Sequence, residues 1–166
     1  MKNADTVQSL KLANGKQVYL TPGIHSNLQV AIIEQFGPRY AAQATVLLLH
    51  DVVNQGVIFE RERLEQLGIP VTDGNMLADI IIYNAERNWL YLIRVGTSFR
   101  LVSHRRRQKL EKLLEGCTAE LVYISAFANF AEYQRYAMHI AWGSHVWIAE
   151  TPGHLIHYNG ERFLAE

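Results

Sequence analysis

Hydrophobic residues recur along most of this chain with strand-like and helix-like spacings, separated by short polar turns. Four continuous apolar runs are typical of adjacent buried strands in one sheet: residues 46–49, 80–82, 90–93 and 121–124. Apolar residues three or four positions apart predict amphipathic helices at residues 24–36 and 103–115. The alternation of these elements predicts an α/β fold with a mixed central sheet flanked by helices.

Glycine, asparagine and proline mark the boundaries of the first elements. Asn14-Gly15 predicts a hairpin that joins residues 7–12 to residues 16–20. We therefore expect residues 1–20 to form an N-terminal hairpin lead-in and residues 21–166 to form one compact domain.

The helix that follows has recognisable start and stop signals. Thr21 is expected to cap it, Pro22 suits its first position, and Gly37-Pro38 should end it. Its buried face should carry four residues: Ile24, Leu28, Ile32 and Phe36.

A pair of opposite charges stands out in the middle of the chain. Residues 79–83 and 88–95 read as two strands joined by a turn about Glu86 and Arg87. In an antiparallel hairpin Asp79 then lies roughly opposite Arg94. This arrangement permits two interpretations, an ion pair at the sheet end or an arginine that binds phosphate.

The basic residues are unevenly distributed, although the formal net charge is zero. Zero net charge gives no general attraction to nucleic acid or membranes. Half of the sixteen basic residues nevertheless fall in one stretch, which predicts one basic side: Arg87, Arg94, Arg100, Arg105, Arg106, Arg107, Lys109 and Lys112.

Several of these basic residues lie near the start of the helix at residues 103–115. Such a run is most often a solvated helix face, but three arginines there oppose the helix dipole, and this cost slightly raises the case for an external anion such as a DNA phosphate. The candidate contacts for duplex DNA or phosphate are Arg94, Arg100, Arg105, Arg106 and Lys109.

The composition of the chain indicates the cellular compartment of the protein. Cys117 is the only cysteine, so an internal disulfide is excluded and a reducing compartment is favoured. No apolar run approaches the length of a membrane span, and the first residues lack the apolar core of a secretory signal. We expect a cytoplasmic protein that does not bind membranes.

Two histidines near the C-terminus are candidate metal ligands. Asn159-Gly160 predicts a hairpin between residues 154–158 and 161–164. His154 and His157 are three apart on the first strand and would point to opposite faces, which favours packing or hairpin hydrogen bonds over a zinc site.

Four stretches resemble the C-terminal domain of the BsuBI/PstI type II restriction endonucleases: residues 20–40, 77–93, 113–127 and 140–164. The resemblance implies a restriction-endonuclease-like fold of the PD-(D/E)XK superfamily that acts on duplex DNA with Mg²⁺. Full-length members carry a further N-terminal region implicated in DNA recognition. In this chain we expect only the twenty-residue lead-in at that position.

The departures from the family pattern lie where the chemistry would occur. Asp79 matches the first acid of the motif, but the preceding proline is Ala78 here. Arg94 stands at the position of the family's glutamate. In the next helix Arg105 replaces a usual lysine and Lys109 replaces a usual acid. The resemblance therefore implies a remnant of the catalytic motif.

Two functional hypotheses follow. In the first, the domain is a pseudo-nuclease with a degenerate site that binds DNA or a protein partner through its basic face. In the second, it is an active Mg²⁺-dependent endonuclease in which Asp79 and Asp51 hold the metal and Glu34, also acidic in the family, assists. Duplex-cleaving enzymes often act as pairs, so a homodimer is also possible.

Overall fold

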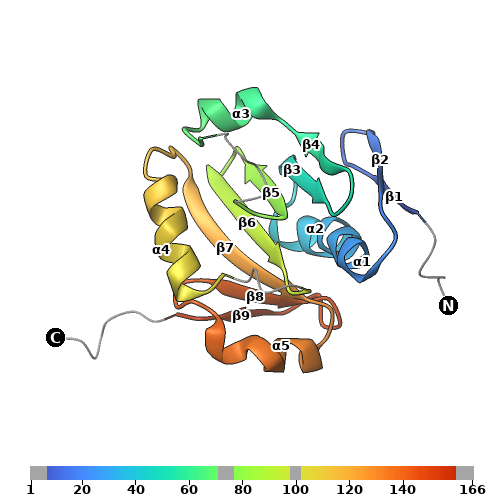
Figure 1. Ribbon diagram of the computed structural model, residues 1–166. Coiled ribbons are helices and arrows are strands. Elements are labelled where there is room, and N and C mark those ends of the chain that lie inside the picture. Colours follow the sequence, from blue (N-terminus) through green and yellow to red (C-terminus); the bar gives the residue numbers. More distant parts are fainter. Residues whose placement is uncertain (1–6, 71–76, 98–101, 160–166) are drawn as a thin grey trace.

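The computed structural model describes residues 7–70, 77–97 and 102–159, and its centre is a seven-stranded sheet (Figure 1). The strand order across this sheet is β4-β3-β5-β6-β7-β8-β9. The strands are β3 (Thr45–Asp51), β4 (Gln55–Phe59), β5 (Ile80–Asn84), β6 (Trp89–Val95), β7 (Glu120–Phe127), β8 (His145–Ile148) and β9 (Leu155–His157).

The sheet is mixed, as expected. The pairs β4/β3, β3/β5, β5/β6 and β8/β9 are antiparallel, whereas β6/β7 and β7/β8 are parallel. The parallel connections run through helices α4 (His104–Leu113) and α5 (Phe130–Tyr136). The four predicted apolar runs lie on the adjacent strands β3, β5, β6 and β7, which confirms the predicted sheet.

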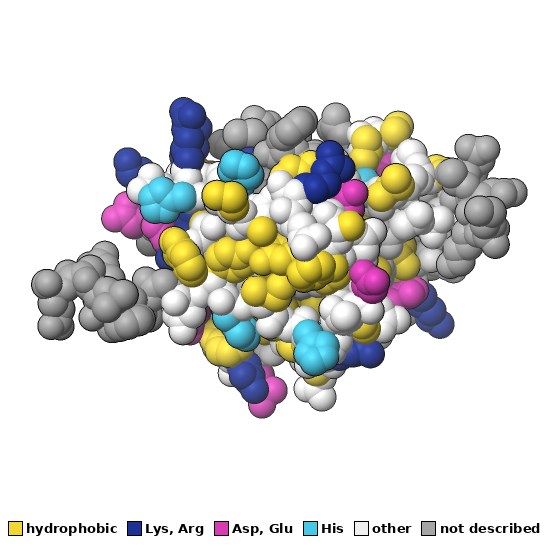
Figure 2. Space-filling view, turned by 90° about the horizontal axis from the view of Figure 1, so that it is seen from below, with side chains coloured by type: hydrophobic (Ala, Val, Ile, Leu, Met, Phe, Trp, Pro, Cys, Tyr) yellow, Lys and Arg dark blue, Asp and Glu magenta, His cyan; other side chains and the backbone are white. Residues whose placement is uncertain are grey.

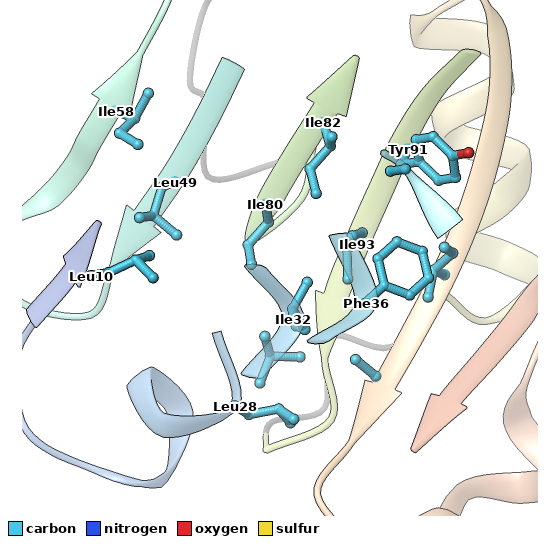
Figure 3. Close-up of a cluster of buried hydrophobic side chains, with 14 of the residues drawn as sticks. Leu10, Leu28, Ile32, Phe36, Leu49, Ile58, Ile80, Ile82, Tyr91 and Ile93 are labelled. Atoms are coloured by element: carbon cyan, nitrogen blue, oxygen red, sulfur yellow. The ribbon is translucent and has the colours of Figure 1, made fainter. Parts of the chain in front are cut away.

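Helices cover both faces of the sheet and create two main clusters of buried side chains (Figure 1). On one face Leu28, Ile32 and Phe36 pack against Ile80 and Ile93, as Figure 3 shows. On the other face α4 and α3 (Arg61–Gln66) cover alternate residues of the same strands. Because strand side chains alternate, both faces of β5 and β6 are buried, which explains their uninterrupted apolar sequences.

The first helical segment differs from the sequence prediction. It comprises α1 (Ile24–Ala31), a π-helical turn η1 (Ile32–Phe36) and α2 (Gly37–Tyr40), so Gly37-Pro38 does not end it. Pro38 lies in the first turn of α2, directly after the π-helical turn. Ile24 is 72% exposed and does not belong to the buried face.

Thr21 is not the cap of this helix. Gly23 occupies the N-cap position and makes no side-chain hydrogen bond there. The Thr21 hydroxyl instead donates to the Asp51 carboxylate at the end of β3. The expected cap was wrong because a partner thirty residues away in sequence accepts the hydroxyl. Ser103 by contrast caps α4 as predicted, with its Oγ accepting from the Arg106 N–H at 3.2 Å.

The hairpin of β1 (Gln8–Lys11) and β2 (Gln17–Leu20) forms as predicted about Asn14-Gly15. It is a separate two-stranded sheet, but Leu10 and Leu20 are buried in the cluster shared with α1. At the other end of the chain β9 pairs with β8. The second strand of the C-terminal hairpin predicted there, residues 161–164, lies outside the described residues.

Helix α5 and the 3₁₀ turn η3 (Ala137–His139) lie at the bottom of Figure 1. Phe130 and Met138 in this segment, and Trp142 just beyond it, are largely exposed. The view from below in Figure 2 shows a band of hydrophobic side chains with basic residues at its margin. None of the helices in the described ranges is long and apolar enough to cross a membrane.

Candidate functional site

Strands β5 and β6 bring Asp79 and Arg94 together at the end of the central sheet. Ile80 pairs with Ile93, and the hydrogen bond from the Asp79 N–H to the Ile93 carbonyl, 3.0 Å, extends this register by one residue. Asp79 is therefore opposite Arg94, as the hairpin pattern predicted. The Arg94 Nη1 lies 3.7 Å from the Asp79 Oδ1, within ion-pair distance.

Both partners of this ion pair are buried. Arg94 is 1% exposed and Asp79 is 4% exposed. The second carboxylate oxygen of Asp79 accepts the Val95 N–H at 2.8 Å. A buried carboxylate requires such partners, because desolvation of an unpaired charge costs several kcal/mol. The guanidinium and the backbone thus satisfy the aspartate within the protein.

Helix α1 adds a histidine that sequence reasoning missed. The Nε2 of His25 lies 3.8 Å from the Asp79 Oδ1, and its Nδ1 lies 2.8 Å from the Thr97 Oγ1. His25 and Thr97 are separated by 72 positions, so no local spacing could have linked them. Among the described residues, the Asp79 carboxylate thus contacts one arginine, one histidine and a backbone amide.

Asp51 has different partners. Its carboxylate accepts hydrogen bonds from the Thr21 N–H and Oγ1 and from the N–H groups of Val53 and Asn54. Burial raises the pKa of Asp51, but these hydrogen bonds more than offset that effect and leave the pKa below its usual value. The strand partner of Asp79 is His50 rather than Asp51, so alternation directs the Asp51 side chain to the opposite face of the sheet.

Glu34 lies far from this ion pair along the strands. It is an exposed residue of the π-helical turn and lines a pocket together with Thr45, Val46 and Ile82. Thr45 pairs with Tyr83, at the end of β5 away from Asp79. The structure therefore does not bring together the three acids of the remnant motif, Asp79, Asp51 and Glu34.

This arrangement does not fit a Mg²⁺ ion. Mg²⁺ needs an octahedral set of oxygen ligands, usually with one or two carboxylates and several waters. At Asp79 one carboxylate oxygen faces a guanidinium and the other accepts a backbone N–H. Among the described residues no group of three histidines, cysteines or acids is placed to hold a metal.

Helix α4 carries the other predicted phosphate contacts. Arg105 and Lys109 are exposed and one turn apart, and Lys112 extends this basic stripe by another turn. Arg106 is half-buried. Arg107 points elsewhere, to the Glu111 carboxylate at 3.0 Å and to the Trp142 carbonyl.

The basic stripe begins near the ion pair. The Val102 N–H donates to the Ser125 Oγ at 3.3 Å, and Ser125 is the β7 partner of Arg94. The expectation of one basic side is wrong for two residues, because Arg94 is buried and Arg87 lies over the Trp89 ring at the opposite end of β6. Arg100 falls outside the described residues.

Comparisons with known proteins identify the family of this arrangement. A model of the BsuBI/PstI restriction endonuclease domain matches residues 8–161. The chain belongs to the BsuBI/PstI restriction endonuclease family. The "Type II restriction enzyme BsuBI" of Bacillus subtilis is 43% identical over 155 residues, which cover 93% of this chain and 49% of that enzyme.

Two further proteins support this assignment. The "Type II restriction enzyme AplI" of Arthrospira platensis is 26% identical over 94% of this chain and 50% of that enzyme. The solved structure of the SdaI restriction endonuclease superposes with a TM-score of 0.87 at 30% identity, over 98% of this chain and 51% of that one. The fold is thus restriction-endonuclease-like, and the chain spans about half the length of these relatives.

Proposed function

We propose that this restriction-endonuclease domain binds duplex DNA without cleaving it at the Asp79 site. The observation that carries the proposal is the buried guanidinium of Arg94, 3.7 Å from the Asp79 carboxylate. A positive charge at that position repels a divalent cation by about 2 to 8 kcal/mol at contact distance, twice the value for two unit charges. An arginine also stays protonated, so it cannot act as a general base toward water.

The DNA contact in this proposal belongs to helix α4. Arg105, Lys109 and Lys112 form an exposed basic stripe, and their positive charges suit the phosphates of a duplex. We assign no phosphate contact to Arg94, because a side chain that is 1% exposed cannot reach a duplex on the surface. Contacts to phosphates alone give weak binding with little sequence preference.

One experiment tests binding and cleavage together. The purified chain is mixed with supercoiled plasmid in millimolar Mg²⁺, and the products are run on native and denaturing gels. We expect a mobility shift on the native gel and intact supercoiled DNA after deproteinisation. Mg²⁺-dependent linear product that disappears in Asp79→Ala would show that the domain is an active endonuclease.

Charge-removing variants locate the binding surface. Arg105→Gln and Lys109→Gln should each lower the slope of log affinity against log salt by about one unit. Lys16→Gln, an exposed charge on the N-terminal hairpin, is the matched control and should leave the slope unchanged. Equal slopes for all three variants would show that the DNA contact does not lie on α4.

A further inference from the structure

Two histidines on the adjacent strands β8 and β9 face each other away from the Asp79 site. His145 on β8 is the antiparallel partner of His157 on β9. Their Nδ1 atoms are 2.7 Å apart, and the rings meet edge to face with centroids 4.8 Å apart. His145 is half-buried and His157 is exposed, so solvent and small ions can reach the pair from one side.

The backbone around this pair is held in place by neighbouring contacts. The Tyr158 N–H donates to the Ser144 carbonyl at 3.0 Å, which continues the pairing of β8 with β9 by one residue. The Tyr158 hydroxyl lies 2.6 Å from the Tyr133 hydroxyl and 3.0 Å from the Ala137 carbonyl. Both histidines therefore project from strands whose separation and register are fixed, as a preorganised ligand pair requires.

The spacing of the two nitrogens suits a shared ion. A first-row metal about 2.0 to 2.1 Å from each of two imidazole nitrogens in cis positions, at about 90°, sets those nitrogens about 2.9 Å apart. The observed 2.7 Å is within a few tenths of an ångström of that value. We propose that His145 and His157 form a two-histidine site for a transition-metal ion that takes ligands at about 90°, such as Ni²⁺.

A metal ion at this site would keep open coordination positions. The described residues supply two ligands, and water or another exogenous ligand completes the coordination. Without metal one ring donates its Nδ1 proton to the other ring. Binding through both Nδ1 atoms moves that proton to the Nε2 of the same ring, so both imidazoles stay neutral. A bound ion would link edge strand β9 to β8.

Titration of the tag-free chain with Ni²⁺ tests this site. Calorimetry should show saturable binding of one ion per chain, and the ion should raise the melting temperature because it binds only the folded strand pair. Mg²⁺ should do neither, since it prefers oxygen ligands. This outcome is independent of whether the Asp79 site cleaves DNA.

Two variants separate the proposed site from nonspecific histidine binding. His157→Asn should abolish both the saturable binding and the thermal shift, and His145→Gln should do the same. His154→Asn, an exposed histidine three residues from His157 and outside the pair, is the matched control and should behave as the unmodified chain. No saturable binding in the unmodified chain, or unchanged binding in His157→Asn, would show that the pair is only a hydrogen bond.

Discussion

Replacement of Arg94 by glutamate should make the stability of this domain depend on Mg²⁺. The substitution places a second buried carboxylate opposite Asp79, since residues opposite each other on antiparallel strands have Cβ atoms about 4.5 to 5.5 Å apart. Without metal the two like charges repel by about 1 to 4 kcal/mol. With metal they supply the paired carboxylates that Mg²⁺ binds.

The rise in the melting temperature of Arg94→Glu on addition of Mg²⁺ follows from the affinity for the ion. A ligand at one hundred times its dissociation constant stabilises the folded state by about 2.7 kcal/mol. For a domain of this size that free energy corresponds to a rise in melting temperature of about 5 to 10 °C. Thermal melts with and without Mg²⁺ measure this shift directly. We do not expect cleavage to return, because the resemblance to the family implies further departures at Arg105 and Lys109.

Arg94→Gln is the matched control for this experiment. Glutamine has nearly the shape of glutamate but no charge, so its melting temperature should not respond to Mg²⁺. The double variant Asp79→Asn/Arg94→Glu should also fail to respond, because only one carboxylate remains. If Mg²⁺ shifted the melting temperature of all three variants by a similar amount, Mg²⁺ would bind elsewhere in the protein.

Removal of either partner of the buried ion pair should destabilise the fold strongly. Asp79→Asn keeps an oxygen that can accept the Val95 N–H but removes the negative charge beside Arg94. Arg94→Met leaves the Asp79 charge buried without its guanidinium. Each change should lower the free energy of unfolding by about 3 to 5 kcal/mol, because it leaves an uncompensated buried charge. Urea unfolding of each variant measures this loss.

The combined variant completes a double-mutant cycle. Asp79→Asn/Arg94→Met removes both charges, so its stability should lie much closer to that of the unmodified chain than either single variant does. The coupling free energy between residues 79 and 94 is then large. Single variants that each cost less than about 1 kcal/mol and that add in the double variant would mean that the pair behaves like a solvated surface contact.

Much of the fold could be predicted from local sequence patterns. The apolar runs of β3, β5, β6 and β7 are distinctive because both faces of these strands are buried. The opposition of Asp79 and Arg94 was also predictable, since a short turn fixes the register of a hairpin.

Contacts between distant segments could not be predicted in this way. Thr21 has the sequence context of a helix cap, yet its hydroxyl binds Asp51 across thirty positions. His25 reaches Asp79 and Thr97 only once α1 packs against the sheet. Asp51 and Glu34 matched acidic positions of the family, but their burial and partners depend on the strands and the π-helical turn around them.

Calorimetric titration of the unmodified chain with Mg²⁺, in the presence of a short DNA duplex, tests the central claim most directly. The ion pair of Asp79 and Arg94 predicts that the chain adds no saturable Mg²⁺ binding at millimolar concentrations to that of the duplex alone, and that Asp79→Asn gives the same trace. A saturable site in the unmodified chain that is lost in Asp79→Asn would contradict the claim, because Asp79 would then bind metal despite Arg94.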